Sequence, residues 1–295
     1  MDPLVLFLQA LVSGVSIGSI YALVALGFVL IYKATEVVNF AQGELMMVGA
    51  FFAYTLVDLG GVPFVPGVLL ALLATAAFGV LLNRLLLRPL IGSPAFTIVL
   101  ATVAVSTLLR AVATMVPGWG VETHRLSNPL AGAVVPVGKL AVSAEHLMVV
   151  GLTLVLVALL YLFFSRARIG IALQATSQNQ LAAGYAGINV RRMFGLIWGI
   201  SAAVAALAGV LLAPVAFVHV NMCYIGLKAF PAAVLGGFGS LPGAVVGGLI
   251  IGVIEELAGL YAPEGVKNVA AYAVLLAVLM VRPQGLFGVS KRLRV

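Results

Sequence analysis

Residues 4–31 form an uncharged, mostly apolar stretch, and this stretch limits the fold more than any other feature of the chain. A helix needs about 20 apolar residues to cross the hydrocarbon core of a bilayer, and the stretch is longer than that. We therefore expect a helix that is tilted, or broken near Gly14 and Gly18. Further apolar stretches follow without the alternation that marks outer-membrane strands. The sequence thus predicts an all-α, polytopic membrane helical bundle.

Composition supports the same fold class. Only 8% of the residues are charged, against about a quarter in a soluble domain, so the chain cannot cover itself with a water-facing surface. The net charge of +7 comes from cations clustered in two short segments, which indicates topology and not nucleic-acid binding. A sole cysteine, Cys223, excludes an internal disulfide and a cysteine-based metal cluster. No basic region precedes the first stretch, so it is expected to be a retained span.

We expect eight or nine membrane segments in one transmembrane domain, residues 1–295. They occupy residues 4–31, 45–57, 62–82, 96–116, 147–164, 193–214, 227–241, 243–260 and 266–281. Residues 45–57 and 227–241 are each too short to cross alone. The Gly239–Gly243 sequence, with Pro242 inside it, predicts a broken or re-entrant pair.

Two basic segments without acidic residues set the orientation. They are residues 165–192 and the C-terminal tail, which carries Arg282, Lys291, Arg292 and Arg294. Both are expected in the cytoplasm, so an even number of crossings separates them. That parity favours nine segments. It places the N-terminus and the loop of residues 117–146 on the outer, periplasmic side.

Small residues four positions apart recur in the later spans. They are Gly195/Gly199/Ala203, Ala205/Gly209, Gly243/Gly247 and Gly248/Gly252. Close helix contacts in lipid need such residues. The pattern predicts packing within the bundle, and a subunit interface is the alternative.

Catalytic motifs are not found. The chain has no phosphate-binding loop, zinc-protease motif or nucleophile turn. Its histidines, His124, His146 and His219, lie far apart and are expected in loops or interfaces. We expect no catalytic residue and no metal site.

A short helix is predicted inside residues 165–192. Ser177 and Gln180 fit a capping box, and Gly187 fits a left-handed C-cap followed by Ile188. The sizeable apolar groups of this helix are Leu181, Tyr185 and Ile188. These few apolar side chains are too small a set to form a core of their own. We therefore expect the helix to dock on a partner protein, in preference to the alternative that it lies on the membrane surface.

A second polar group, Glu36, Asn39, Gln42 and Glu44, lies at the entrance of a span. These residues can line a pathway or face a second membrane subunit. The alternative, which the pattern favours, is a hydrogen-bond cluster that fixes a broken helix. Arg110 can pair with an acid or snorkel to the interface, and the direction of its span favours snorkelling.

Several motifs resemble those of the branched-chain amino acid ABC transporter permeases. They are GSIYAL at 18–23, VNFAQGE at 38–44, GIALQAT at 170–176, AAGYAGINV at 182–190, AALAGVL at 205–211, GGFGSLPGA at 236–244 and RPQGLFG at 282–288. Together they cover the chain from end to end, and NFAQGE is similar to the LivH-like subunit. One departure is Gln174, where relatives carry arginine, which softens the expected contact with the ATPase.

The resemblance implies a multi-pass permease of the bacterial inner membrane. Its implied partners are a LivM-like second permease, two ATPase subunits and a periplasmic binding protein, with ATP and Mg²⁺ bound by the ATPases and no cofactor on this chain. The implied contacts with the ATPase are Ala175, Ser177, Gln180, Ala183, Gly184, Tyr185, Gly187 and Ile188. Asn39, Gln42 and Glu44 remain candidates for the pathway or the permease interface.

The implied function is import of leucine, isoleucine and valine. Import of urea, short amides or aromatic acids by a related permease is one alternative. Another is a secondary transporter or channel that works alone. The spans carry few ionisable groups for ion coupling, which argues against that last alternative.

Overall fold

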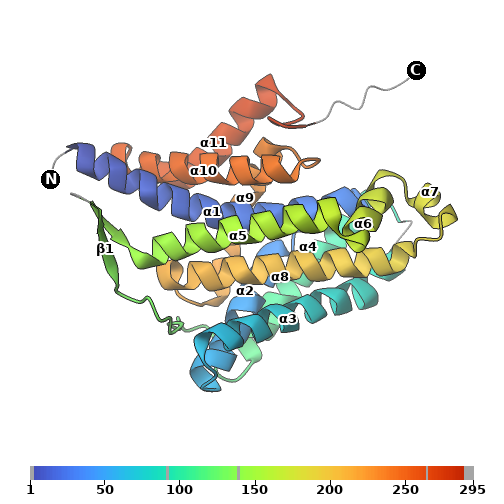
Figure 1. Cartoon of the computed structure of the whole chain (residues 1–295), viewed down its shortest axis with the longest axis horizontal. Coiled ribbons are helices and arrows are strands. Elements are labelled where there is room, and N and C mark those ends of the chain that lie inside the picture. Colours follow the sequence, from blue (N-terminus) through green and yellow to red (C-terminus); the bar gives the residue numbers. More distant parts are fainter. Residues whose placement is uncertain (1–2, 91–92, 138–139, 264, 289–295) are drawn as a thin grey trace.

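The computed structural model describes residues 3–90, 93–137, 140–263 and 265–288, and it confirms the helical membrane bundle (Figure 1). Six helices are long and apolar enough to cross a bilayer. They are α1 (Pro3–Thr35), α3 (Phe64–Leu82, extended by a π turn and a 3-10 turn to Leu90), α4 (Ala95–Met115), α5 (Ala144–Arg166), α8 (Val190–Ala216) and α10 (Leu241–Tyr261).

Three shorter apolar helices complete the bundle: α2 (Gln42–Tyr54), α9 (Cys223–Gly236) and α11 (Val266–Val281). With the six long helices, they fall on the nine expected segments. The break expected around Gly239–Gly243 is confirmed, because α9 ends at Gly236 and α10 begins at Leu241. Ser240 caps α10 by accepting a hydrogen bond from Gly243 N at 3.0 Å. The loop of residues 117–146 contains a hairpin that the sequence did not indicate, β1 (Val134–Val137) paired antiparallel with β2 (Leu140–Ser143).

The two basic segments lie at the same end of the bundle, as parity predicts. One groove is lined by Lys33 at the end of α1, by Gln174 and by the α9–α10 break. Leu286 N and Phe287 N donate to Leu235 O and Gly236 O beside that break. The start of α1 and the β-hairpin lie at the opposite end (Figure 1). Of the predicted basic tail, Lys291, Arg292 and Arg294 lie outside the described residues.

The two halves of the chain contain the same arrangement of a long helix followed by a short one, and the sequence shows no repeat that would have predicted it. A long helix (α1 or α8) ends, a non-glycine residue with positive φ follows (Glu36 at 57°, Phe217 at 59°), and a half-length helix (α2 or α9) begins a few residues later. The helices α1 and α8 run in opposite directions (Figure 1). In this repeat α1 corresponds to α8, α2 to α9 and α3 to α10. The contact of α1 with α10 therefore corresponds to that of α8 with α3, and the contact of α1 with α9 corresponds to that of α8 with α2.

Glycines form the most extensive helix contact of the bundle, between α1 and α10. A Cβ on Gly252 would lie 2.3 Å from Gly18 Cα, and one on Gly248 would lie 2.4 Å from Ala22 N. Helix α1 is continuous over Pro3–Thr35. Of the two alternatives that the sequence left open, a tilted helix or one broken near Gly14 and Gly18, the break is therefore excluded, and these glycines serve close packing on α10. The small residues on α10 serve packing within the chain, as expected.

Replacement of Gly252 by alanine should destabilise the protein by about 1–3 kcal/mol, because the added methyl group overpacks a backbone contact. The matched control is Gly151→Ala on α5, where an added Cβ meets nothing within 4 Å. That control should be neutral or stabilising by up to about 1 kcal/mol, since alanine favours helix. Thermal unfolding in one detergent measures both, and equal stability of the two variants would contradict the packing role.

Candidate coupling helix and adjoining polar cavity

The basic segment of residues 165–192 folds into two short helices, α6 (Arg168–Gln178) and α7 (Gln180–Tyr185). The predicted start of the short helix is wrong. Asn179, and not Ser177, caps α7, and its side chain accepts from Ala182 N at 2.9 Å. Ser177 belongs to α6, where its hydroxyl donates to Gln174 O at 2.8 Å. Both residues are preferred caps, so the sequence did not distinguish them.

The predicted end of α7 is confirmed. Gly187 has φ of 82°, a conformation that glycine adopts without steric cost. Gly187 N donates to Gly184 O and Ile188 N donates to Ala183 O, each at 3.0 Å. This pair of bonds is the Schellman motif, and it fixes the direction in which the chain leaves α7 toward α8.

Helix α7 presents its large apolar side chains to the outside. Tyr185 is 91% exposed and Leu181 is 75% exposed, whereas Ala183 is 4% exposed and anchors the helix to the bundle. Of the other predicted contact residues, Gly184 and Gly187 are exposed, and Ala175 and Ile188 are half-buried. A tyrosine and a leucine displayed together on one helical turn form a small docking surface.

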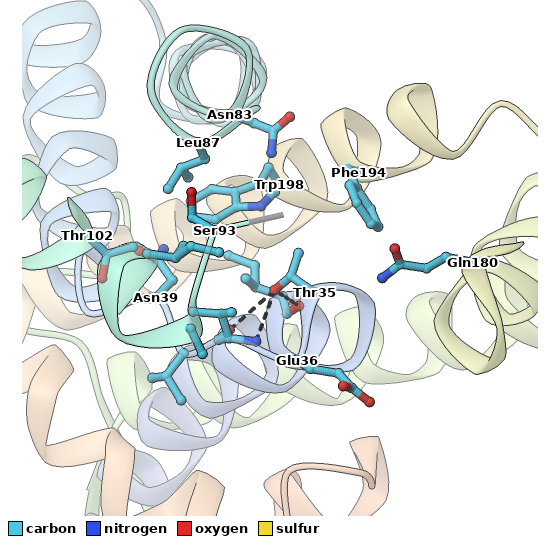
Figure 2. Close-up of a pocket in the computed structure, with 15 residues that line it drawn as sticks. Thr35, Glu36, Asn39, Asn83, Leu87, Ser93, Thr102, Gln180, Phe194 and Trp198 are labelled. Carbon is cyan, nitrogen blue, oxygen red and sulfur yellow. Dashed lines mark hydrogen bonds between the residues drawn. The ribbon is translucent and has the colours of Figure 1, made fainter. Parts of the chain in front are cut away.

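Gln180, the first residue of α7, connects this surface to the bundle. Its amide nitrogen donates to Ala34 O at the end of α1, at 3.4 Å. The same side chain borders a cavity of about 340 Å³ at this end of the bundle (Figure 2). The cavity is lined by Ile31, Thr35, Glu36, Val37, Val38, Asn39, Asn83, Leu87, Ser93, Ala95, Ile98, Thr102, Gln180, Phe194 and Trp198.

The cavity wall mixes apolar side chains with hydrogen-bonding groups. Trp198, only 4% exposed, carries a buried indole N–H without a hydrogen-bond partner among the described residues. The Asn83 amide lies beside that indole in Figure 2. A buried donor without a partner is costly, so the cavity favours occupation by water or by a polar ligand. Sequence reasoning missed Trp198, because a tryptophan in an apolar helix is usually a packing residue.

Of the predicted polar group, Asn39 lines the cavity and Gln42 lies behind it. Asn39 Nδ2 donates to Gln42 Oε1 at 3.3 Å, and Ser201 Oγ on α8 donates to Gly27 O at 2.9 Å and lies 3.2 Å from Gln42 Oε1. Asn39 and Gln42 are 1% and 0% exposed. These bonds hold the break between α1 and α2 against α8.

Glu44 forms an ion pair inside the bundle. Its fully buried carboxylate accepts from Arg110 Nη2 and from Ser106 Oγ, each at 2.7 Å. Arg110 also donates to Tyr224 Oη at 2.6 Å. The prediction that Arg110 snorkels to the interface is therefore wrong. A charge at bilayer depth needs a partner, and spacing along the sequence cannot show that α2 and α4 come together.

The described residues hold no group of three histidine, cysteine or acidic side chains that could bind a metal. His124 and His146 contact other parts of the fold. His124 lies 2.5 Å from Trp119 O, and His146 lies 3.0 Å from Ser16 Oγ.

Residues 10–281 match the family model described as branched-chain amino acid transport system / permease component. The high-affinity branched-chain amino acid transport system permease protein BraD of Pseudomonas aeruginosa is 34% identical, over 96% of each chain. LivH of Escherichia coli K12, which bears the same description, is 33% identical, again over 96% of each. A probable LivH of Methanocaldococcus jannaschii is 31% identical, over 92% of this chain and 90% of the relative.

A chain of PsaBC from Streptococcus pneumoniae, solved in complex with Fab, has a similar fold. The TM-score is 0.50 at 15% sequence identity, over 94% of this chain and 92% of that one. At this identity the likeness concerns the fold alone.

Proposed function

Because the chain belongs to the family of branched-chain amino acid transport system permease components, we propose that it imports leucine, isoleucine and valine as one membrane subunit of an ABC transporter. It is a multi-pass membrane protein, and we place it in the bacterial inner membrane. The observation that carries the proposal is the family match over residues 10–281. Helix α7 also supports the proposal, because it is capped at both ends and its exposed apolar side chains provide a docking surface for another protein.

The energy for transport comes, in this proposal, from ATP and Mg²⁺ bound by two separate ATPase subunits. A cleft of one ATPase receives Tyr185 and Leu181. Gln180 joins α7 to the end of α1, so movement of the seated helix reaches the helices around the cavity. A partner of this kind shifts the bundle between two access states through its different affinity for them.

The remaining partners take the other surfaces. A periplasmic binding protein delivers substrate at the end that carries the β-hairpin, and a LivM-like permease completes the pathway. Asn39 lies on the wall of the cavity that faces the ATPase end, whereas Gln42 and Glu44 hold the helices behind it. Apolar groups such as Ile31, Val38 and Phe194 in the same wall suit an aliphatic side chain.

Uptake by proteoliposomes that hold the complete complex and its binding protein tests the proposal. Labelled leucine should accumulate with ATP and fail to accumulate with a non-hydrolysable analogue. Labelled urea is the comparison substrate. Uptake of urea but not of leucine would show that the protein is a permease of the related importers of urea or short amides. Leucine uptake that does not depend on ATP would indicate a transporter that works alone.

A further inference from the structure

Four arginines surround a pocket at the α7 end of the bundle, apart from the cavity described above. The pocket has a volume of about 320 Å³ and lies between the end of α3 and the start of α8. Its lining contains Arg84 and Arg88 from the turns that extend α3, and Arg191 and Arg192 from the first turn of α8.

No acid balances these charges. Among the described residues the ion pairs join Arg110, Lys228 and Lys267 to glutamates, and none includes the four arginines. All four side chains are exposed. Two of them sit at the N-terminus of α8, where the helix dipole is positive and disfavours a cation. The four arginines therefore concentrate positive charge at this pocket, where an anionic ligand would be favoured.

Apart from the buried amide of Asn83, the rest of the pocket lining is apolar. Its floor is formed by Val80, Gly195 and Leu196. A Cβ on Gly195 would meet only Val80 Cγ1, at 3.8 Å, whereas one on Gly199, a turn further into the membrane, would lie 2.9 Å from Val80 Cγ2. Thus α3 and α8 touch at Gly199 and separate at Gly195. The adjoining surface of α3 is apolar and exposed, with Leu81 at 47% and Leu85 at 61%.

We propose that this pocket binds an anionic phospholipid. The four guanidinium groups hold the headgroup phosphate, and one acyl chain lies on Gly195 and Val80 against the exposed face of α3. Guanidinium groups bind phosphate oxygens through paired hydrogen bonds, and basic pockets between spans at the cytoplasmic surface suit anionic headgroups.

An acidic surface of the ATPase fits the pocket less well. Helix α7 extends beyond the ends of α3 and α8 (Figure 1), so a protein seated on α7 stands off from the membrane. The floor of the pocket lies on membrane-spanning helices, where a lipid chain reaches and a soluble protein surface does not. The charge above and the apolar floor below match the two parts of one phospholipid molecule.

The purified full-length protein in neutral detergent, titrated with dioleoyl phosphatidylglycerol and followed by native mass spectrometry, tests the proposal. Arg84→Gln with Arg88→Gln should weaken binding about tenfold or more, since each cation near a membrane surface contributes about 1 kcal/mol. The matched control is Arg166→Gln with Arg168→Gln, which removes equal charge at the same end and should change binding less than about twofold. Dioleoyl phosphatidylcholine should bind weakly to every variant.

A second variant separates this site from general charge attraction. Gly195→Leu keeps all four arginines and fills the floor, so it should also lose phosphatidylglycerol, whereas Gly195→Ala should retain it. Unfolding temperatures of all variants serve as the folding control. Equal loss in the Arg166/Arg168 control would overturn the proposal, as would full retention by Gly195→Leu. Binding of inorganic phosphate as tight as that of the lipid would indicate a small-anion site. Unchanged lipid binding with loss of ATPase binding would assign the arginines to the ATPase.

Discussion

Tyr185→Asp combined with Leu181→Asp should weaken binding of the ATPase by about 30-fold or more and abolish ATP-driven uptake. Aromatic anchors at the centre of an interface commonly contribute 2 kcal/mol or more, which exceeds tenfold in affinity. These two side chains are the most exposed large apolar groups of α7, and they support nothing within the bundle. A titrated pull-down of the ATPase by the purified permease measures the effect.

The matched control for this variant is Tyr261→Asp, because Tyr261 is 70% exposed at the far end of α10. It makes the same substitution at the opposite end of the bundle and should leave ATPase binding unchanged. Membrane insertion and unfolding temperature should match the native protein in both cases. ATPase binding that survives the α7 double variant would sink the coupling role of this helix. Ala183 is unsuitable for this test, since it is buried and its replacement would disturb folding.

Arg110→Leu should destabilise the protein by about 3–5 kcal/mol, because it leaves the buried carboxylate of Glu44 without its counter-charge. Ser106 would remain as the one hydrogen-bond partner of Glu44 that the described residues supply. The ion pair also joins α2 to α4, so the loss should loosen the half-length helix α2. Thermal unfolding in a single detergent measures the change.

Replacing Glu44 by a neutral residue in the Arg110→Leu background distinguishes the effect of the unpaired carboxylate from the effect of lost side-chain packing at position 110. The double variant Glu44→Gln with Arg110→Leu should recover most of the stability, because a neutral amide still bonds to Ser106 and carries no charge. Arg125→Leu, at an exposed position, is the control and should change stability by less than about 0.5 kcal/mol. A double variant as unstable as Arg110→Leu alone would show that the packing of the Arg110 side chain, and not its charge, matters.

Much of the fold is predictable because membrane insertion depends on local composition. The positions of the nine segments, the end that holds both basic segments and the break at Gly239–Gly243 follow from apolar length, arginine placement and glycine with proline. The Gly187 cap is predictable for a similar reason, since its signal lies within a few residues. The sequence leaves two caps equivalent at the other end of α7, and the bundle selects Asn179.

Other features depend on contacts between distant segments. The Glu44–Arg110 pair joins positions in α2 and α4, and Trp198 and Asn83 line one cavity only because α8 packs on α3. The repeat of α1–α2 in α8–α9 has no sequence signal, because it is carried by backbone geometry at Glu36 and Phe217. Helix α6 was also missed, because only one short helix, beginning at Ser177, was predicted inside residues 165–192.

The half-length helix α2 also constrains the order in which the protein is made. The 13 residues of α2 continue into a π turn, Thr55–Leu59, and the two together span at most about 27 Å. This length is slightly less than the hydrocarbon core, and the first turn contains the charged Glu44, so α2 is poorly suited to cross the membrane alone. Its polar end forms hydrogen bonds with Ser106 and Arg110 of α4 and with Ser201 of α8. We therefore expect α2 to reach its final position only after residue 201 has been synthesised and has entered the membrane. Truncation before α8 should therefore leave α2 without this partner, and the truncated protein should be degraded faster than the full chain.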